Sequence, residues 1–155
     1  MNNATSPAAK PIIRHPVDIP LEVKALAVAG CNQDNHAYGE FPMMIAVGAL
    51  LRVRIPSINA NEALHGQVIW LARSAHGFII GMSFQTEHEA FRMRMLEQLC
   101  YIEDYRQQAL DNEGRSLDAQ QAATEWIEQY AAAFPSPTLG QQTTHVLKID
   151  AGKQA

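Results

Sequence analysis

Residues 64–106 constrain the fold of this sequence most, because two strand-like segments are followed at once by a long helical one. The two segments read LHGQVIWLA (64–72) and GFIIGMSF (77–84), and TEHEAFRMRMLEQLCYIEDYR (86–106) comes directly after them. A sheet and a helix that each carry one apolar face bury those faces against each other. The sequence therefore predicts a β-hairpin covered by a helix.

Side chains in both strand-like segments alternate with a period of two, which is typical of strands with one buried face. The short connection at residues 74–77 ends in Gly and favours an antiparallel hairpin. Two sets of side chains are expected to share a face each: Leu64, Gly66, Val68 and Trp70 in the first strand, and Phe78, Ile80, Met82 and Phe84 in the second.

The period changes after Phe84, where Thr86 and Glu89 have the spacing of a capping box. In such a box the Thr oxygen accepts an early backbone N–H, so a helix is expected to begin there. An apolar stripe with helical spacing follows, and we expect it to cover the hairpin. The stripe consists of Phe91, Met95, Leu99, Ile102 and Ala109.

Gly114 is expected to end the first helix. A second helix is predicted to begin after Asp118, which has Gln121 three residues later, and to end at Ala133 before Pro135 and Pro137. Its expected apolar face contains Ala122, Trp126, Ile127, Tyr130 and Phe134. We expect that face to pack on the first helix. Further strands are expected at residues 19–28 and 49–55, loops at 31–42 and 58–63, and a short stretch near the end, THVLKI, as an edge strand or a mobile tail.

The composition is that of one globular domain with extensions. The chain has 155 residues, of which 47% are hydrophobic and 18% charged. No apolar run reaches the length of a membrane span, and the first residues lack the pattern of a signal peptide, so a cytoplasmic location without membrane insertion is expected. We divide the chain into a disordered N-terminal arm (1–11), a β-domain with the long helix (12–110), the second helix (111–135) and a tail (136–155).

Charge and motifs argue against several functions. The net charge of −4 disfavours a nucleic-acid binder. The alternating Arg52 and Arg54 are expected on a solvated strand face. The six histidines do not have metal-site spacing, and the sequence has no recognisable catalytic motif. Cys31 and Cys100 are expected to be reduced and packed as small hydrophobic residues. We therefore expect neither an enzyme nor a metal site.

Several short segments, in the same order, resemble the PilZ family over residues 12–110. The resemblance implies a mainly β fold, a small antiparallel PilZ-like β-barrel packed by a long helix, together with a role in signalling by the bacterial second messenger cyclic di-GMP. Residues 113–135 also resemble a helical extension found in one bacterial subgroup. The segments that carry the resemblance are Arg14-His15-Pro16, Gly48 with LLRVRIP, GQVIW, GFIIGMSF and RMRMLEQLCYIEDYR.

The resemblance also implies a nucleotide site, from which this sequence departs. PilZ receptors carry Arg-x-x-x-Arg and Asp/Asn-x-Ser-x-x-Gly, which supply guanidinium groups for guanine and phosphate, and small donors beside a close backbone. Here Arg14 pairs upstream with Lys10, and the second motif is reduced to Asp34, His36 and Gly39. These five residues are the candidate ligand site. Because Lys lacks the planar fork and His replaces a small hydroxyl, we expect nucleotide binding to be weak or absent.

Two functions remain as hypotheses. The first is a non-catalytic regulatory or adaptor protein linked to cyclic di-GMP, which is then the one expected ligand, with no cofactor. The second is a nucleotide-independent module that binds another protein or itself through the same scaffold. Aromatic side chains of the second helix, Trp126, Tyr130 and Phe134, are of the kind found in interfaces.

Overall fold

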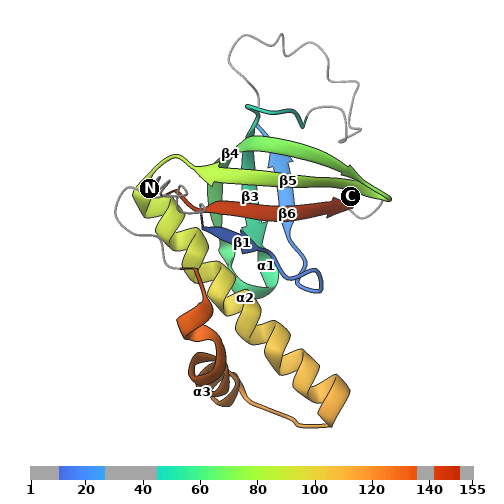
Figure 1. Cartoon of the computed structure of the whole chain (residues 1–155), viewed down its shortest axis with the longest axis vertical. Coiled ribbons are helices and arrows are strands. Elements are labelled where there is room, and N and C mark those ends of the chain that lie inside the picture. Colours follow the sequence, from blue (N-terminus) through green and yellow to red (C-terminus); the bar gives the residue numbers. More distant parts are fainter. Residues whose placement is uncertain (1–10, 27–44, 136–141, 151–155) are drawn as a thin grey trace, which may run out of the picture.

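A computed structural model describes residues 11–26, 45–135 and 142–150. Within these residues, six strands form one mixed sheet in the order β1-β6-β5-β4-β3-β2, accompanied by three α-helices. Helix α2 crosses one face of the sheet and continues beyond it, and α3 packs beside the continuation (Figure 1). The strands are β1 (Ile12–Arg14), β2 (Glu22–Ala25), β3 (Leu50–Ile55), β4 (Ala60–Ser74), β5 (Gly77–Phe84) and β6 (Thr144–Asp150).

The sheet differs from the predicted antiparallel barrel. Strands β2 to β6 are joined by antiparallel pairs, but β1 and β6 run parallel, with Ile12 opposite Thr144. Among the described residues β1 and β2 are the two outer strands and do not pair with each other, so the sheet stays open. The architecture is therefore mixed α/β.

The predicted hairpin is confirmed in β4 and β5, where Ser74 pairs with Gly77. A register shift between Val68 and Trp70 introduces a bulge that the sequence pattern missed. Leu64 and Val68 face the core as expected, but beyond the bulge Trp70 turns away from it and is 38% exposed. Its indole lies across Gly81, where a Cβ atom would collide with the ring, so the strand needs glycine at this position.

Two local predictions were wrong. The expected loop at 58–63 is a short helix, α1 (Pro56–Asn59), followed directly by the first residues of β4. The tail stretch THVLKI is neither an edge strand nor a mobile tail, because it forms most of β6, between β1 and β5. Only 22–25 of the expected strand at 19–28 are a strand within the described residues.

Helix α2 (Glu87–Glu113) begins and ends where the sequence predicted. The Thr86 hydroxyl accepts the Glu89 backbone N–H at 3.1 Å. At the other end Gly114 has a positive φ of 64°, a conformation that glycine adopts without strain, and its N–H bonds to carbonyls of the last turn. The local rules for caps therefore fix both ends of a 27-residue helix.

The face that α2 buries differs from the predicted stripe over the first half of the helix, whereas Ala109 of that stripe is buried and Ile102 is half-buried as predicted. Phe91, Met95 and Leu99 are 59%, 42% and 47% exposed. The buried face is rotated from them and contains Met93, Leu96, Glu97, Cys100 and Ala109. Met93, Leu96 and Cys100 join the main core against strand residues such as Leu51, Ile80 and Met82. A carboxylate, Glu97, thus lies in the apolar contact between helix and sheet.

The second helix, α3 (Ala119–Tyr130), has the predicted Asp118 cap, completed as a capping box with Gln121. A 3-10 turn, η2 (Ala131–Ala133), extends it. Trp126 and Phe134 are buried with Ile13 in a second small core against Tyr101 of α2. The predicted packing on the first helix is therefore confirmed for these two side chains, and Ala122 is buried as well. Ile127 is exposed, and Tyr130 is half exposed while its ring packs edge-on against Tyr105 of α2.

Candidate functional site

Of the five predicted ligand residues, the described structure contains Arg14. Lys10, Asp34, His36 and Gly39 lie outside the described residues. Arg14 ends β1 with an exposed side chain, and its carbonyl accepts a hydrogen bond from the Tyr101 hydroxyl of α2. The backbone at Arg14 is therefore held by β6 on one side and by α2 on the other.

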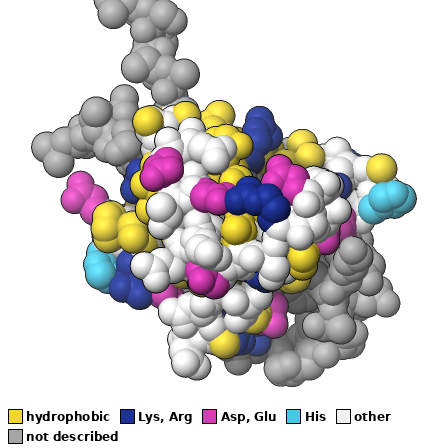
Figure 2. Space-filling view, turned by 90° about the horizontal axis from the view of Figure 1, so that it is seen from below, with side chains coloured by type: hydrophobic (Ala, Val, Ile, Leu, Met, Phe, Trp, Pro, Cys, Tyr) yellow, Lys and Arg dark blue, Asp and Glu magenta, His cyan; other side chains and the backbone are white. Residues whose placement is uncertain are grey.

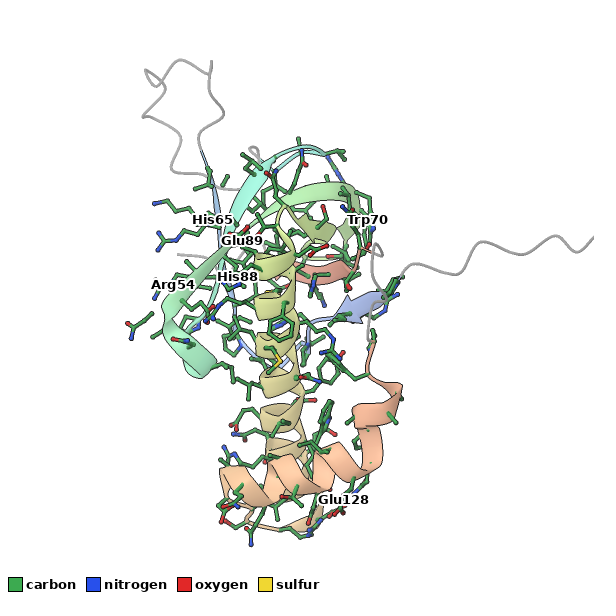
Figure 3. All side chains as sticks on the ribbon, turned by 90° about the vertical axis from the view of Figure 1, so that its left-hand side faces the viewer. Arg54, His65, Trp70, His88, Glu89 and Glu128 are labelled. Carbon is green, nitrogen blue, oxygen red and sulfur yellow. The ribbon has the colours of Figure 1, made fainter. Side chains whose placement is uncertain are left out.

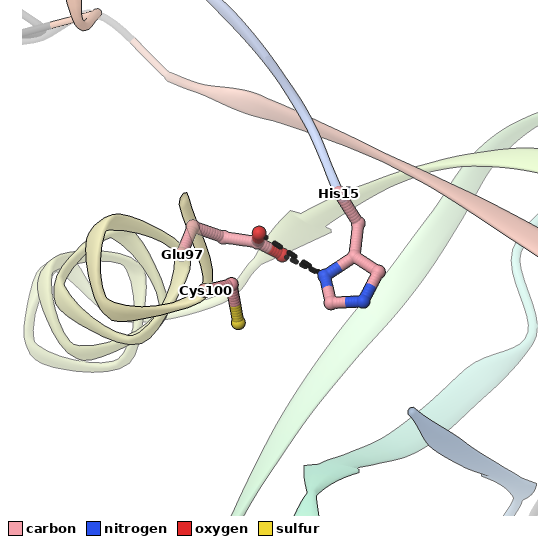
Figure 4. A group of neighbouring side chains, drawn as sticks. All are labelled: His15, Glu97 and Cys100. Atoms are coloured by element: carbon pink, nitrogen blue, oxygen red, sulfur yellow. Dashed lines mark hydrogen bonds and ion pairs between the residues drawn. The ribbon is translucent and has the colours of Figure 1, made fainter. Parts of the chain in front are cut away.

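The residue after Arg14 forms the most unusual polar contact in the described structure. His15 Nδ1 lies 3.0 and 3.1 Å from the two carboxylate oxygens of Glu97 (Figure 4). Its Nε2 lies 2.6 Å from the Ile19 carbonyl oxygen. The two side chains are only 4% and 0% exposed. We call this His15–Glu97 pair the latch, because it joins the segment between β1 and β2 to α2.

The partners of His15 determine its protonation. A carboxylate and a carbonyl both accept hydrogen bonds, so both ring nitrogens donate when the imidazole is charged. Burial alone would lower the pKa of His15, but the hydrogen bond and charge of Glu97, together with the Ile19 carbonyl, raise it above its ordinary value. These contacts favour the imidazolium form of His15, and with that form the latch is a buried ion pair.

Cys100 completes a group of three potential metal ligands. Donor atoms of His15, Glu97 and Cys100 lie within 4.8 Å of one another, and such a set could hold zinc. Here the donor atoms of His15 and Glu97 are already joined by hydrogen bonds to each other. Burial and the charge of Glu97 raise the pKa of the Cys100 thiol, which opposes both the thiolate that a metal needs and nucleophilic chemistry. This arrangement favours a structural contact over catalysis.

Sequence spacing missed this cluster because His15 and Glu97 are 82 positions apart. One feature of the sequence could have indicated it. Glu97 and Cys100 occupy one helix face with Met93 and Leu96, and a carboxylate in an apolar stripe requires a buried partner.

A second set of polar side chains ties the beginning of α2 to the sheet. Glu89 lies 3.6 Å from His65 of β4, and Arg92 pairs with Glu62. His65, His88, Glu89 and Arg54 lie on the same side of the molecule (Figure 3). His65 and Arg92 are about half exposed, and exposed pairs contribute little stability, so these contacts orient the helix more than they stabilise it.

The chain was compared with protein-family models, with curated proteins and with solved structures, and none of them matches it. Within the described ranges, no helix combines the length and apolar character that crossing a membrane requires. The geometry of the molecule itself is therefore the basis for the functional argument.

Proposed function

We propose that this chain is a non-catalytic, cytoplasmic regulatory adaptor of the PilZ type, linked to cyclic di-GMP signalling. Support comes from the resemblance described above and from the way the resembling segments pack: β3, the β4–β5 hairpin and α2 share one core. The bacterial setting belongs to the same proposal.

The placement of Arg14 carries this proposal. The latch holds the residue after it and Tyr101 holds its carbonyl, so the guanidinium projects from a backbone that is fixed against α2. A ligand that bridged Arg14 and the preceding arm would change the direction in which the arm leaves the sheet. A partner protein that binds one direction of the arm more tightly than the other would respond to such a change.

Titration calorimetry of the whole chain with cyclic di-GMP tests this function. We expect saturable but weak binding, in the micromolar to millimolar range, which is lost in Arg14→Ala because one planar phosphate and guanine donor is removed. The matched control is Arg52→Ala, which removes an exposed arginine from β3, far from β1 in the sheet. Equal binding by cyclic GMP, or unchanged binding by Arg14→Ala, would contradict the proposal.

A nucleotide-independent interaction module is the second candidate, and the exposed face of α2 favours it. Phe91, Met95 and Leu99 occupy successive turns and form an apolar stripe that the described residues leave uncovered. Such stripes often mark interfaces. If this candidate is correct, sedimentation velocity detects association that grows with concentration and falls in Leu99→Glu, whereas Leu110→Glu, at an exposed position farther along α2, has little effect. A chain that remains monomeric at all concentrations would exclude self-association.

A further inference from the structure

An open groove of about 360 Å³ lies where β1, α2 and α3 meet. Ile13, Trp126 and Phe134 are buried beneath it, and Ile12 and Tyr130, 48% and 47% exposed, belong to its lining. The end of the molecule where α2 and α3 lie displays hydrophobic side chains among acidic and basic ones (Figure 2). The groove lining combines aromatic surface with polar groups that come almost entirely from one face of α2.

Aromatic rings dominate this lining. Tyr101 packs edge-on against Phe134 with ring centres 5.5 Å apart, and Tyr105 packs edge-on against Tyr130 at 6.1 Å. Trp126 contacts Tyr101, Tyr130 and Phe134, so the rings hold one another in place. Aromatic rings carry negative charge on their faces, and a groove lined with them attracts flat cations.

Asp104 adds a negative charge at the same place. Its carboxylate accepts one hydrogen bond, from Gln108 Nε2 at 2.8 Å. Among the described residues no Lys or Arg nitrogen lies within 4.0 Å of it. Burial and the charge of Asp18 raise the pKa of Asp104, against the opposing effects of Gln108 and His15. The carboxylate therefore has unused acceptor positions and no ion-pair partner among the described residues.

Neighbouring acidic groups are already occupied, in contrast to Asp104. Glu125 accepts a hydrogen bond from the Tyr105 hydroxyl at 2.6 Å and pairs with Arg115. Glu103 pairs with Arg106, and Glu97 pairs with His15. Among these carboxylates of α2 and α3, Asp104 is the one that lines the groove without a cation.

We infer that this groove binds the arginine side chain of a partner polypeptide. A guanidinium is flat, so it can stack on tyrosine, and its two parallel N–H groups match one carboxylate. Lysine offers a compact charge without that plane. A phosphate or carboxylate ligand would be repelled by Asp104. The exposed apolar Ile12 and Tyr130 favour a peptide, whose neighbouring side chains can cover them, over a small cation alone.

This inference rests on the proposed adaptor role in one respect, because the groove would be the adaptor's contact with its partner. The test of the inference needs no nucleotide. The probe is the capped tripeptide acetyl-Leu-Arg-Leu-amide, with lysine and citrulline analogues, added to the ¹⁵N-labelled whole chain. NMR shifts at Asp104, Gln108 and the Trp126 indole should saturate with the arginine peptide, be several-fold weaker with lysine, and be absent with citrulline.

Two variants give the groove a specific readout. Asp104→Asn should weaken arginine-peptide binding about tenfold, whereas Asp111→Asn, at an exposed acid farther along α2, should not change it. Tyr130→Ala should also weaken binding, with the charge of Asp104 intact. Equal binding of the three peptides, unchanged affinity in Asp104→Asn, or shifts centred elsewhere would overturn the inference. Loss of cyclic di-GMP binding alone would leave it standing.

Discussion

Glu97→Ala is expected to destabilise the fold by roughly 3–5 kcal/mol, because it leaves the His15 imidazole buried without its counter-charge. Glu97→Gln should be much milder. A glutamine amide can donate to Nδ1 of a neutral His15 while Nε2–H still donates to the Ile19 carbonyl. The free energy of unfolding of each variant is measured by denaturant unfolding, monitored by tryptophan fluorescence.

The double variant His15→Leu/Glu97→Leu is the control for charge burial. Replacing both members of a buried pair by apolar residues is often neutral or stabilising, so we expect the double variant to be far more stable than Glu97→Ala.

The pH dependence of stability gives a second test of the latch. Since the pKa of His15 is raised in the folded state, the stability from the latch is complete below about pH 6.5, the ordinary value, and is lost as pH rises through the folded pKa. Glu97→Gln should flatten that alkaline decline; similar losses in Glu97→Ala and the double variant would contradict this account.

The second large effect is expected at His145, a β6 residue that is fully buried edge-on against Phe84. Neither of its ring nitrogens has a hydrogen-bond partner among the described residues, and burial lowers its pKa to about 4. Between pH 6.5 and 4 the unfolded chain binds a proton that the folded chain excludes. The free energy of unfolding should therefore fall by about 3 kcal/mol across this range from His145 alone.

His145→Leu should remove that acid dependence and raise stability at pH 7 by roughly 1 kcal/mol, since an unpaired buried polar group is replaced by an apolar one. Unfolding curves at pH 7.0, 5.5 and 4.5 for the wild type and the variant provide the comparison. His76→Gln, at an exposed position in the β4–β5 turn, is the matched control and should keep the wild-type slope. A variant whose stability still falls as steeply as the wild type would show that His145 is not the group responsible.

Local features of the fold were predictable from the sequence. The hairpin, the Thr86 and Asp118 caps and the Gly114 stop depend on residues a few positions apart, and each was confirmed. The placement of β6 beside β1 was not predictable in this way, because it joins segments from opposite ends of the described chain. The bulge that turns Trp70 away from the core depends similarly on the fit between two strands.

The rotation of α2 shows most clearly why the rest could not be predicted. The predicted stripe carries no charge, but its residues Phe91, Met95 and Leu99 are exposed. The helix instead buries the stripe that contains Glu97, because His15 neutralises it from a distant segment. The same contact shows why only part of the candidate site was predicted. Arg14 was found from a local motif, but the latch beside it joins distant segments and was missed.

The position of β6 has a consequence for how the protein is made. The ribosome synthesises β1, the β3–β5 strands and both long helices before β6, yet β6 lies between β1 and β5 in the sheet. Until β6 arrives, β5 has an unpaired edge and β1 has no neighbouring strand, a state in which exposed strand edges can join those of other chains. The sheet can be completed only after nearly all described residues have been synthesised, so the β5 edge stays open to other chains for as long as α2, α3 and β6 are being made.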